Sequence, residues 1–120
     1  MAIAFRRAVR EFIVPSDLTL PPEQQTTWLL RPLDVFDAAE LADTYTADEK
    51  GWAAKAVQMA KMSLVGWRNF KDADGNEVAF VGLNNRATDD DLRLIPFAVI
   101  LEIVQEVHRY EAISRKQVGE

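Results

Sequence analysis

The 120-residue sequence contains no cysteine, one histidine and five glycines, and each shortage removes a kind of chemistry. Without cysteine there is no disulfide, no thiol nucleophile and no thiolate ligand for a metal. Zinc would need more nitrogen ligands than the single histidine, His108, supplies. The glycines are scattered, and none begins a GxxxxGK or GxGxxG phosphate-binding loop. We therefore predict no catalytic residues, no metal and no cofactor, with a small enzyme built from dispersed carboxylates as the alternative.

The sequence also lacks long apolar runs and an excess of positive charge. Its longest uncharged apolar run, LIPFAVIL, is far shorter than the ~20 residues of a membrane-spanning helix. The start, MAIAFRRAVR, has too few apolar residues before its first arginine for a secretory signal. The net charge of −5 argues against general nucleic-acid binding, which depends on Lys and Arg at phosphates. We expect a soluble, cytoplasmic protein.

One basic cluster is present, formed by Arg6, Arg7 and Arg10. No aromatic residues interleave with it as base-stacking platforms would. We interpret the cluster as part of a solvated strand or arm, with a nucleic-acid regulator as the alternative.

What remains is typical of one globular domain, with 48% hydrophobic and 28% charged residues. Residues 1–32 have the pattern of an extended hairpin and loop, and residues 33–120 have helical spacing. AVREFIV (8–14) and TTWLLR (26–31) are expected to be strands, because they contain β-branched and aromatic residues and flank a proline-rich loop. The predicted fold class is α+β and predominantly helical, with an N-terminal β-hairpin and three to four helices.

The first helix is expected over 33–45, LDVFDAAELADTY, with Asp34 as its N-cap. Acidic residues in its first turns suit the positive end of the helix dipole. The expected apolar side consists of Leu33, Phe36, Leu41 and Tyr45, and the expected solvated side of Asp37, Glu40 and Asp43.

A second helix is expected over 50–67, after a capping box formed by Thr46 and Glu49. Gly51 would lie inside this helix at a cost of ~1 kcal/mol relative to alanine, which suggests close packing or a bend. The expected stripe on one side of the helix is Trp52, Ala56, Ala60 and Leu64.

The C-terminal part predicts a short helix followed by a long one. Thr88 and Asp91 have capping-box spacing, and the helix they begin should end near Leu94. Pro96 cannot lie inside a continuous helix, so a new or kinked helix is expected from there. Its apolar face is broad, which favours a central place in the core, with partner contact as the alternative. The expected apolar positions are Phe97, Val99, Ile100, Leu101, Ile103, Val104, Val107, His108 and Tyr110, and the expected exposed positions are Glu102, Glu106 and Arg109.

The stretch WRNFKDADGNEVAF (67–80) raises the question of a calcium loop. Alignment of an EF-hand on Gly75 places Phe70 and Val81 at ligand positions, where neither side chain can coordinate. A start at Asp72 fails as well, because it places a glutamate where the glycine is required. We therefore predict a type I turn over Asp72-Gly75 that closes a short hairpin.

The order of several segments resembles a known family. The segments are EFIVPSDLTL (11–20), TTWLLRPLDVFDAAELAD (26–43), LVGWRNFKDADGNEVAF (64–80) and LRLIPFAVILEIVQEVHRYEAIS (92–114). A Gly-Trp pair, followed by an x-D-x-D-G turn before the final apolar helix, makes the sequence similar to the small tail assembly chaperones of long-tailed bacteriophages. The resemblance covers most of the chain.

The resemblance implies a non-catalytic protein of the bacterial host cytoplasm that is absent from the finished virion. Its implied partners are the tape measure protein, whose long apolar helices it keeps soluble, and the tail tube protein. Many relatives also have a frameshifted, longer form. An apolar groove or helix face would bind the partner, in the helix-in-groove manner. From periodicity, the candidate contact residues are Trp52, Trp67, Phe97, Ile100, Val104 and His108.

Other interpretations stay open at this point. A structural phage tail or connector component, or another small protein-interaction module, would have a similar composition. Self-association is also open. His108 is expected to be a packed or half-exposed helix histidine, because the sequence suggests no nucleophile beside it for a general base to activate.

Overall fold

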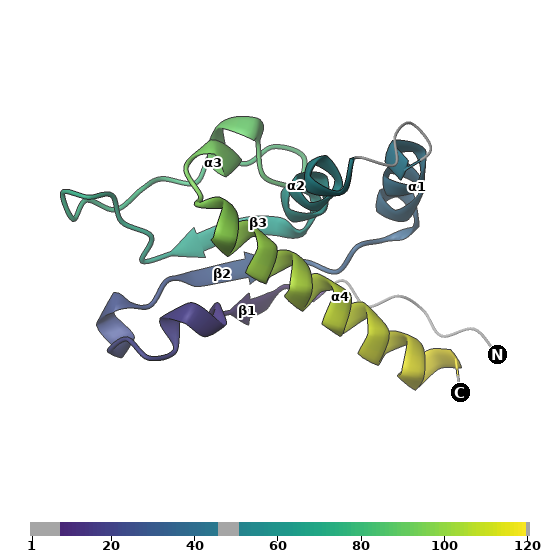
Figure 1. Ribbon diagram of the computed structural model, residues 1–120, viewed down its shortest axis with the longest axis horizontal. Helices are drawn as coiled ribbons and strands as arrows, with labels where there is room; N and C mark the ends of the chain where they lie inside the picture. The colour runs from purple at the N-terminus through teal and green to yellow at the C-terminus, as the bar shows by residue number, and fades with distance from the viewer. Residues whose placement is uncertain (1–7, 46–50, 120) are drawn as a thin grey trace.

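The computed structural model describes residues 8–45 and 51–119, and it arranges them as a three-stranded antiparallel sheet with four α-helices (Figure 1). This confirms the α+β class and the N-terminal hairpin. In chain order the elements are β1 (Arg10–Phe12), the 3₁₀ turns η1 (Pro15–Asp17) and η2 (Pro22–Gln24), β2 (Thr27–Leu30), α1 (Val35–Tyr45), α2 (Trp52–Ser63), β3 (Leu64–Arg68), α3 (Asp89–Arg93) and α4 (Phe97–Gly119).

The central strand of the sheet is β2, which pairs antiparallel with both β1 and β3. Phe12, Trp28 and Trp67 lie opposite one another across the three strands, and Trp28 meets Trp67 edge-on with 5.9 Å between ring centroids. Gly66 lies opposite Leu29, where an added Cβ would come within 3.1 Å of Leu29 Cδ1. Glycine at this position therefore leaves room for the leucine side chain.

The third strand corrects the expectation of a single helix over 50–67. The helix ends at Ser63, and Leu64 is already extended, with φ −82° and ψ 120°. Gly66 is a poor helix former and Trp67 favours strands, but these local preferences are weak. The decisive contribution is the pairing of β3 with β2, which buries Leu64 and Trp67.

The start of α2 also differs from the expectation. Gly51 is the N-cap of the helix and not an interior residue. The expected destabilisation of the helix by an interior glycine therefore does not arise. The capping box expected from Thr46 and Glu49 lies outside the described residues, as do Arg6 and Arg7.

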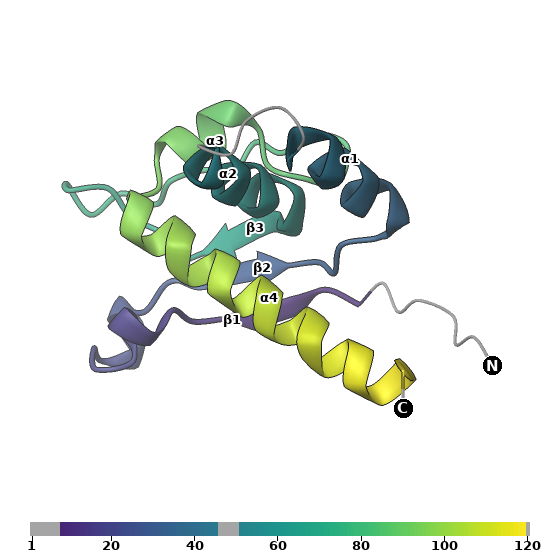
Figure 2. The same ribbon diagram turned by 45° about the vertical axis from the view of Figure 1, so that its right-hand side comes forward.

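The core lies between the sheet and the helices α2 and α4, and α4 crosses the sheet in both views (Figures 1 and 2). The predicted break at Pro96 is confirmed, because the N–H groups of Val99 and Ile100 donate to the Pro96 carbonyl at the start of α4. The largest fully buried apolar side chains are Trp28, Leu30, Met62, Leu64, Ile103 and Val14.

The predicted Asp72-Gly75 turn is also confirmed. Gly75 N–H donates to the Asp72 carbonyl at 3.0 Å, and Gly75 has a φ of +84°, which favours glycine. The Asp72 carboxylate accepts the backbone N–H groups of Asp74 and Asn76 through Oδ1. This carboxylate oxygen therefore stabilises the turn from within.

The predicted capping box at α3 is present, and Asp91 does more than cap the helix. Its carboxylate accepts hydrogen bonds from the backbone N–H and the hydroxyl of Thr88. It also accepts the N–H groups of Val81 and Gly82, both at 2.9 Å, while only 1% of Asp91 is exposed. One buried side chain thus holds the loop before α3 against the helix.

The structure confirms most of the predicted orientation of α1, with Leu33 and Leu41 buried and Glu40 and Asp43 exposed, but it corrects two positions. Asp34 caps the helix as expected, with its carboxylate accepting the N–H groups of Phe36 and Asp37. However, Asp37, which was expected in water, is only 3% exposed, whereas Phe36, which was expected to be packed, is 81% exposed. The reason is Arg31, whose guanidinium donates to both Asp37 carboxylate oxygens at 2.7 and 3.1 Å.

This buried ion pair joins three segments of the chain. Arg31 follows β2, Asp37 lies in α1, and Arg86, in the loop before α3, donates to Asp37 at 3.1 Å. Arg31 Nε also donates to the Asn85 carbonyl at 2.7 Å. Asn84 and Asn85 both have positive φ, the geometry of a two-residue type I′ turn, which presents that carbonyl.

A second correction concerns the face of α4 that was expected to be exposed. Glu106 is only 8% exposed and accepts hydrogen bonds from Arg10 at 3.3 Å and Arg109 at 2.8 Å. The Arg10 guanidinium also lies 3.8 Å from the centre of the Tyr110 ring. Arg10 therefore lies in a strand, as one of the two expectations for the basic cluster had it, but it is not solvated, because its side chain contacts α4 and fixes it against β1.

We expect Asp37→Asn to lower the free energy of unfolding by about 3 kcal/mol, because Arg31 would stay buried without its counter-charge. Urea unfolding followed by far-ultraviolet circular dichroism measures the change. The matched control is Asp90→Asn, which removes an ion pair with Arg93 whose side chains are 84% and 73% exposed. The control should lower stability by less than ~1 kcal/mol. Equal effects of the two substitutions would show that the buried pair does not hold the fold together.

Stability should also fall in acid, and Asp91 should contribute to the fall. Burial raises the pKa of Asp91, but the N–H groups of Thr88, Val81 and Gly82 outweigh it and hold the pKa below its usual 3.8. The unfolded chain therefore binds the proton at a higher pH than the folded chain, and stability is lost as pH falls below about 4. The stability difference between the wild type and Asp91→Asn, measured in urea, should shrink from pH 7 to pH 3. A stability difference between the wild type and Asp91→Asn that stays constant from pH 7 to pH 3 contradicts this role of Asp91. The matched control is Asp74→Asn, which alters an exposed carboxylate in the Asp72-Gly75 turn.

Candidate functional site

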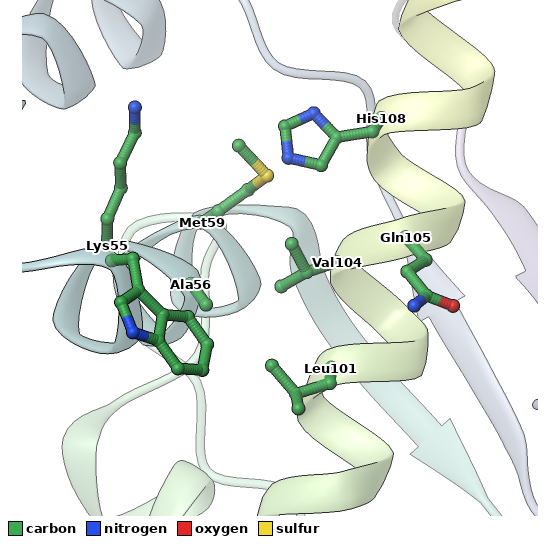
Figure 3. Close-up of a pocket in the computed structure, with 8 residues that line it drawn as sticks. Lys55, Ala56, Met59, Leu101, Val104, Gln105 and His108 are labelled. Carbon is green, nitrogen blue, oxygen red and sulfur yellow. The ribbon is translucent and has the colours of Figure 1, made fainter.

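An apolar groove of about 380 Å³ lies between α2 and α4 (Figure 3). Its lining residues are Trp52, Lys55, Ala56 and Met59 from α2 and Leu101, Val104, Gln105 and His108 from α4. Both sets have the spacing i, i+3, i+4, i+7, so each is one continuous stripe on its helix. The groove is therefore formed where two helical stripes face each other without filling the space between them.

The broad apolar surface of α4 is divided between two tasks. Ile100, Ile103 and Val107 are buried in the core. The adjacent stripe, from Leu101 to His108, lines the groove, and Val104 belongs to it while being only 8% exposed. The breadth noted in the sequence thus reflects one face toward the core and a neighbouring face toward the groove.

The apolar surface continues beyond the groove through an aromatic pair. Trp52 lines the groove and is 64% exposed, and Phe97 at the start of α4 is 45% exposed. Their ring centroids are 6.4 Å apart and the ring planes are tilted by 53°. Two large exposed aromatic side chains in contact are typical of a binding surface.

Two basic side chains, Lys55 and His108, lie toward one end of the groove, whereas the Gln105 side chain points away from the other lining residues (Figure 3). Figure 3 shows Lys55, Met59 and His108 toward this end, Leu101 toward the other and Val104 between them. Lys55 contributes its aliphatic stem to the wall, and burial lowers the pKa of its amine. The groove therefore offers an apolar floor with nitrogen-bearing side chains at one end.

The structure brings together four of the six residues proposed from the sequence. Trp52, Val104 and His108 line the groove, and Phe97 contacts Trp52. Ile100 is not part of it, because it points into the core and is only 4% exposed.

Trp67 is also placed elsewhere, in an aromatic cluster over the sheet. It is 7% exposed, its ring lies 4.9 Å from Phe80 and 5.0 Å from Phe70, and its Nε1 donates to the Val78 carbonyl at 2.7 Å. Trp67 therefore fixes the 70–80 hairpin to the sheet.

Sequence reasoning missed part of the α2 wall. Lys55, Ala56 and Met59 share the helical stripe of Trp52, and this spacing was visible in the sequence. No pattern in the sequence, however, pairs the α2 stripe with the α4 stripe. Only the packing of α2 against α4 identifies these residues as one wall of a groove.

The described residues that line the groove can bind a partner through apolar contact and hydrogen bonds. None of these described residues has a hydroxyl or thiol group beside His108. Within residues 8–45 and 51–119 no cluster of three or more His, Asp or Glu is placed to hold a metal ion. None of the helices in the described part of the chain has the length and apolarity to cross a membrane.

A second hollow, of about 500 Å³, lies beside α3 and is less suited to a ligand. Its charged side chains already have partners: Lys61 pairs with Asp89 at 2.7 Å, and Arg93 pairs with Asp90 at 2.6 Å. The groove between α2 and α4 is therefore the stronger candidate.

No family model, curated protein or solved structure matches the chain.

Of the contact residues proposed from the sequence, Ile100 is buried in the core and Trp52 is exposed at the groove, so their substitutions should change stability by different amounts. Ile100→Ala should lower the free energy of unfolding by about 3 kcal/mol, because it leaves a cavity in the core. Trp52→Ala should lower it by less than ~1 kcal/mol, because most of the ring is already in water. Urea unfolding of the two variants measures both values. Comparable losses would show that Trp52 belongs to the core and not to a binding surface.

Proposed function

We propose that the protein is a non-catalytic assembly chaperone that holds an amphipathic helix of its partner in the groove between α2 and α4. The observation that carries the proposal is the continuity of the groove with the exposed Trp52–Phe97 pair. An amphipathic helix placed in such a groove would bury its apolar face against both stripes.

The size of the surface fits a short helical segment. From Phe97 to His108 the α4 wall covers eleven residue steps, or roughly 16 Å at 1.5 Å per residue. A partner helix of about three turns would match this length. Its anchors would then follow the i, i+3, i+4, i+7 spacing of the walls.

The expected affinity is moderate. Covering roughly 200 Å² of the Trp52 and Phe97 side chains contributes about 5 kcal/mol before the costs of association. Those costs cancel a large part of the gain. A complex of this kind releases its partner readily, as a chaperone must.

The proposed partners are the tape measure protein and the tail tube protein of a long-tailed bacteriophage, in the cytoplasm of the bacterial host. The resemblance in segment order supports this assignment, including Gly66 and Trp67 followed by the Asp72-Gly75 turn. The groove supports the mode of binding. The resemblance implies that the tape measure protein has long apolar helices, and a groove between two helices can bind one of them. The net charge of −5 is suited to keeping such a complex in solution.

Co-expression with the tape measure protein of the same phage tests the proposal. The protein should co-purify with it, and Trp52→Glu combined with Phe97→Glu should reduce recovery at least ~10-fold, because a charge would be placed in the apolar contact. The matched control is Leu18→Glu combined with Val81→Glu, two side chains that are 61% and 71% exposed and do not line the groove. Full recovery of the groove variant, or loss of recovery in the control alone, contradicts the proposal.

Mass spectrometry of purified virions separates a chaperone from a structural tail component. A chaperone should be missing from mature particles. Stoichiometric presence of the chain in the particle would identify it as a structural subunit.

A further inference from the structure

The helix α1 exposes apolar side chains on the side where a surface helix usually has polar ones. Phe36 is 81% exposed and Val35 is 74% exposed. Ala38, Ala39 and Ala42 are exposed as well, and with Val35 they have the spacing i, i+3, i+4 and i+7 of one stripe. These five residues form the α1 face. In both views α1 lies at the edge of the molecule, and it packs against α2 (Figures 1 and 2).

The fold does not use the α1 face. The inward contacts of the helix are made by Asp37 and Leu41, which are 3% and 8% exposed. Phe36 and Val35 together leave on the order of 250 Å² of apolar surface in water. Contiguous apolar patches of this size on a soluble protein mark interaction sites. The alanines beside them are short enough to let the axis of a second helix approach to about 8 Å.

The exposed charges that border the α1 face are negative. Glu40 and Asp43 follow Phe36 at i+4 and i+7, and α1 contains no Lys or Arg. Glu40 accepts hydrogen bonds from Arg86 and Gln58, yet its side chain stays 48% exposed. A Lys or Arg beside the apolar stripe of a partner would approach these carboxylates, whereas an Asp or Glu there would meet charges of its own sign.

The neighbouring bases do not reverse this sign at the surface. Arg31 and Arg86, with side chains 10% and 25% exposed, are both bound by Asp37. On α2, Lys55 is only 9% exposed. The charge that a partner of α1 can reach is therefore that of Glu40 and Asp43.

A second copy of the chain fits the α1 face less well than a basic partner. Two such faces would each bury on the order of 400 Å², about half of the ~800 Å² per partner in a standard interface. A symmetric pair would also place the same acidic border on both sides, and each chain has a net charge of −5. The surface of an anionic membrane is disfavoured by the same repulsion.

We infer that the α1 face binds an amphipathic helix whose apolar stripe is bordered by Lys or Arg. This is a second interaction surface, because none of its five residues lines the groove between α2 and α4. The inference therefore stands or falls independently of the groove.

Two labelled helical peptides of about 14 residues test the inference against the full chain. They share one apolar stripe and differ only in carrying Lys or Glu beside it. Fluorescence anisotropy at about 50 mM and about 500 mM salt measures binding. The Lys peptide should bind about 5-fold more tightly at low salt, and the preference should shrink at high salt. Val35→Ser combined with Phe36→Ser should weaken its binding at least ~10-fold, and folding should be retained because both side chains are already in water.

Two controls show where the Lys peptide binds. Leu18→Ser combined with Val81→Ser alters side chains that are 61% and 71% exposed and lie outside α1, and it should leave binding unchanged. Trp52→Glu combined with Phe97→Glu places charges at the groove and should also leave binding unchanged. Loss of binding in the groove variant would show that the peptide occupies the groove, which overturns the assignment to α1.

Other outcomes also overturn the inference. Failure of both peptides to bind removes the α1 face as a helix-binding surface, and equal binding or tighter binding of the Glu peptide removes the preference for a basic partner. Sedimentation equilibrium tests the second copy as the occupant. A dimer that forms at micromolar concentration and is lost with Val35→Ser and Phe36→Ser would show that another copy of the chain covers the face.

Discussion

The buried pair between Arg31 and Asp37 is the contact on which the arrangement of this protein depends. A charge removed from water is tolerated only when its partner and its hydrogen bonds are supplied, and here both are. The carboxylate accepts both arms of the Arg31 guanidinium, the N–H of Asp34 and a second guanidinium from Arg86. The pair sets the rotation of α1, which packs against α2, and α2 provides one wall of the groove.

The same principle positions the opposite wall. The helix α4 is fixed to the N-terminal strand by the Arg10–Glu106 contact and to the following turn by Ser16 and Glu102. With one face in the core and another held by polar contacts, α4 presents its remaining stripe to α2. The carboxylates of this protein thus contribute more than solubility, because several of them orient helices.

Much of the fold follows from local sequence signals. The Asp34 cap, the Thr88–Asp91 capping box, the break at Pro96 and the Asp72-Gly75 turn all depend on atoms within about four residues of one another. Each was predicted from residue type and spacing, and each is present in the structure. The N-terminal hairpin was predicted as well, since both strands have β-branched and aromatic residues beside a proline-rich loop.

The sequence by itself determined the fold class, the element boundaries set by caps and prolines, and the residues able to form apolar stripes. Only the tertiary structure decided that 64–68 is a strand, that Asp37 and Glu106 are buried, and that Ile100 and Trp67 belong to the core. The physical reason is the distance along the chain to the deciding partner. Arg86 lies 49 residues from Asp37, and Arg10 lies 96 residues from Glu106. Apolar residues at i, i+3, i+4 and i+7 indicate that a helix has an apolar side. Only the packing of α2 against α4 determines whether that side faces the core or an open groove.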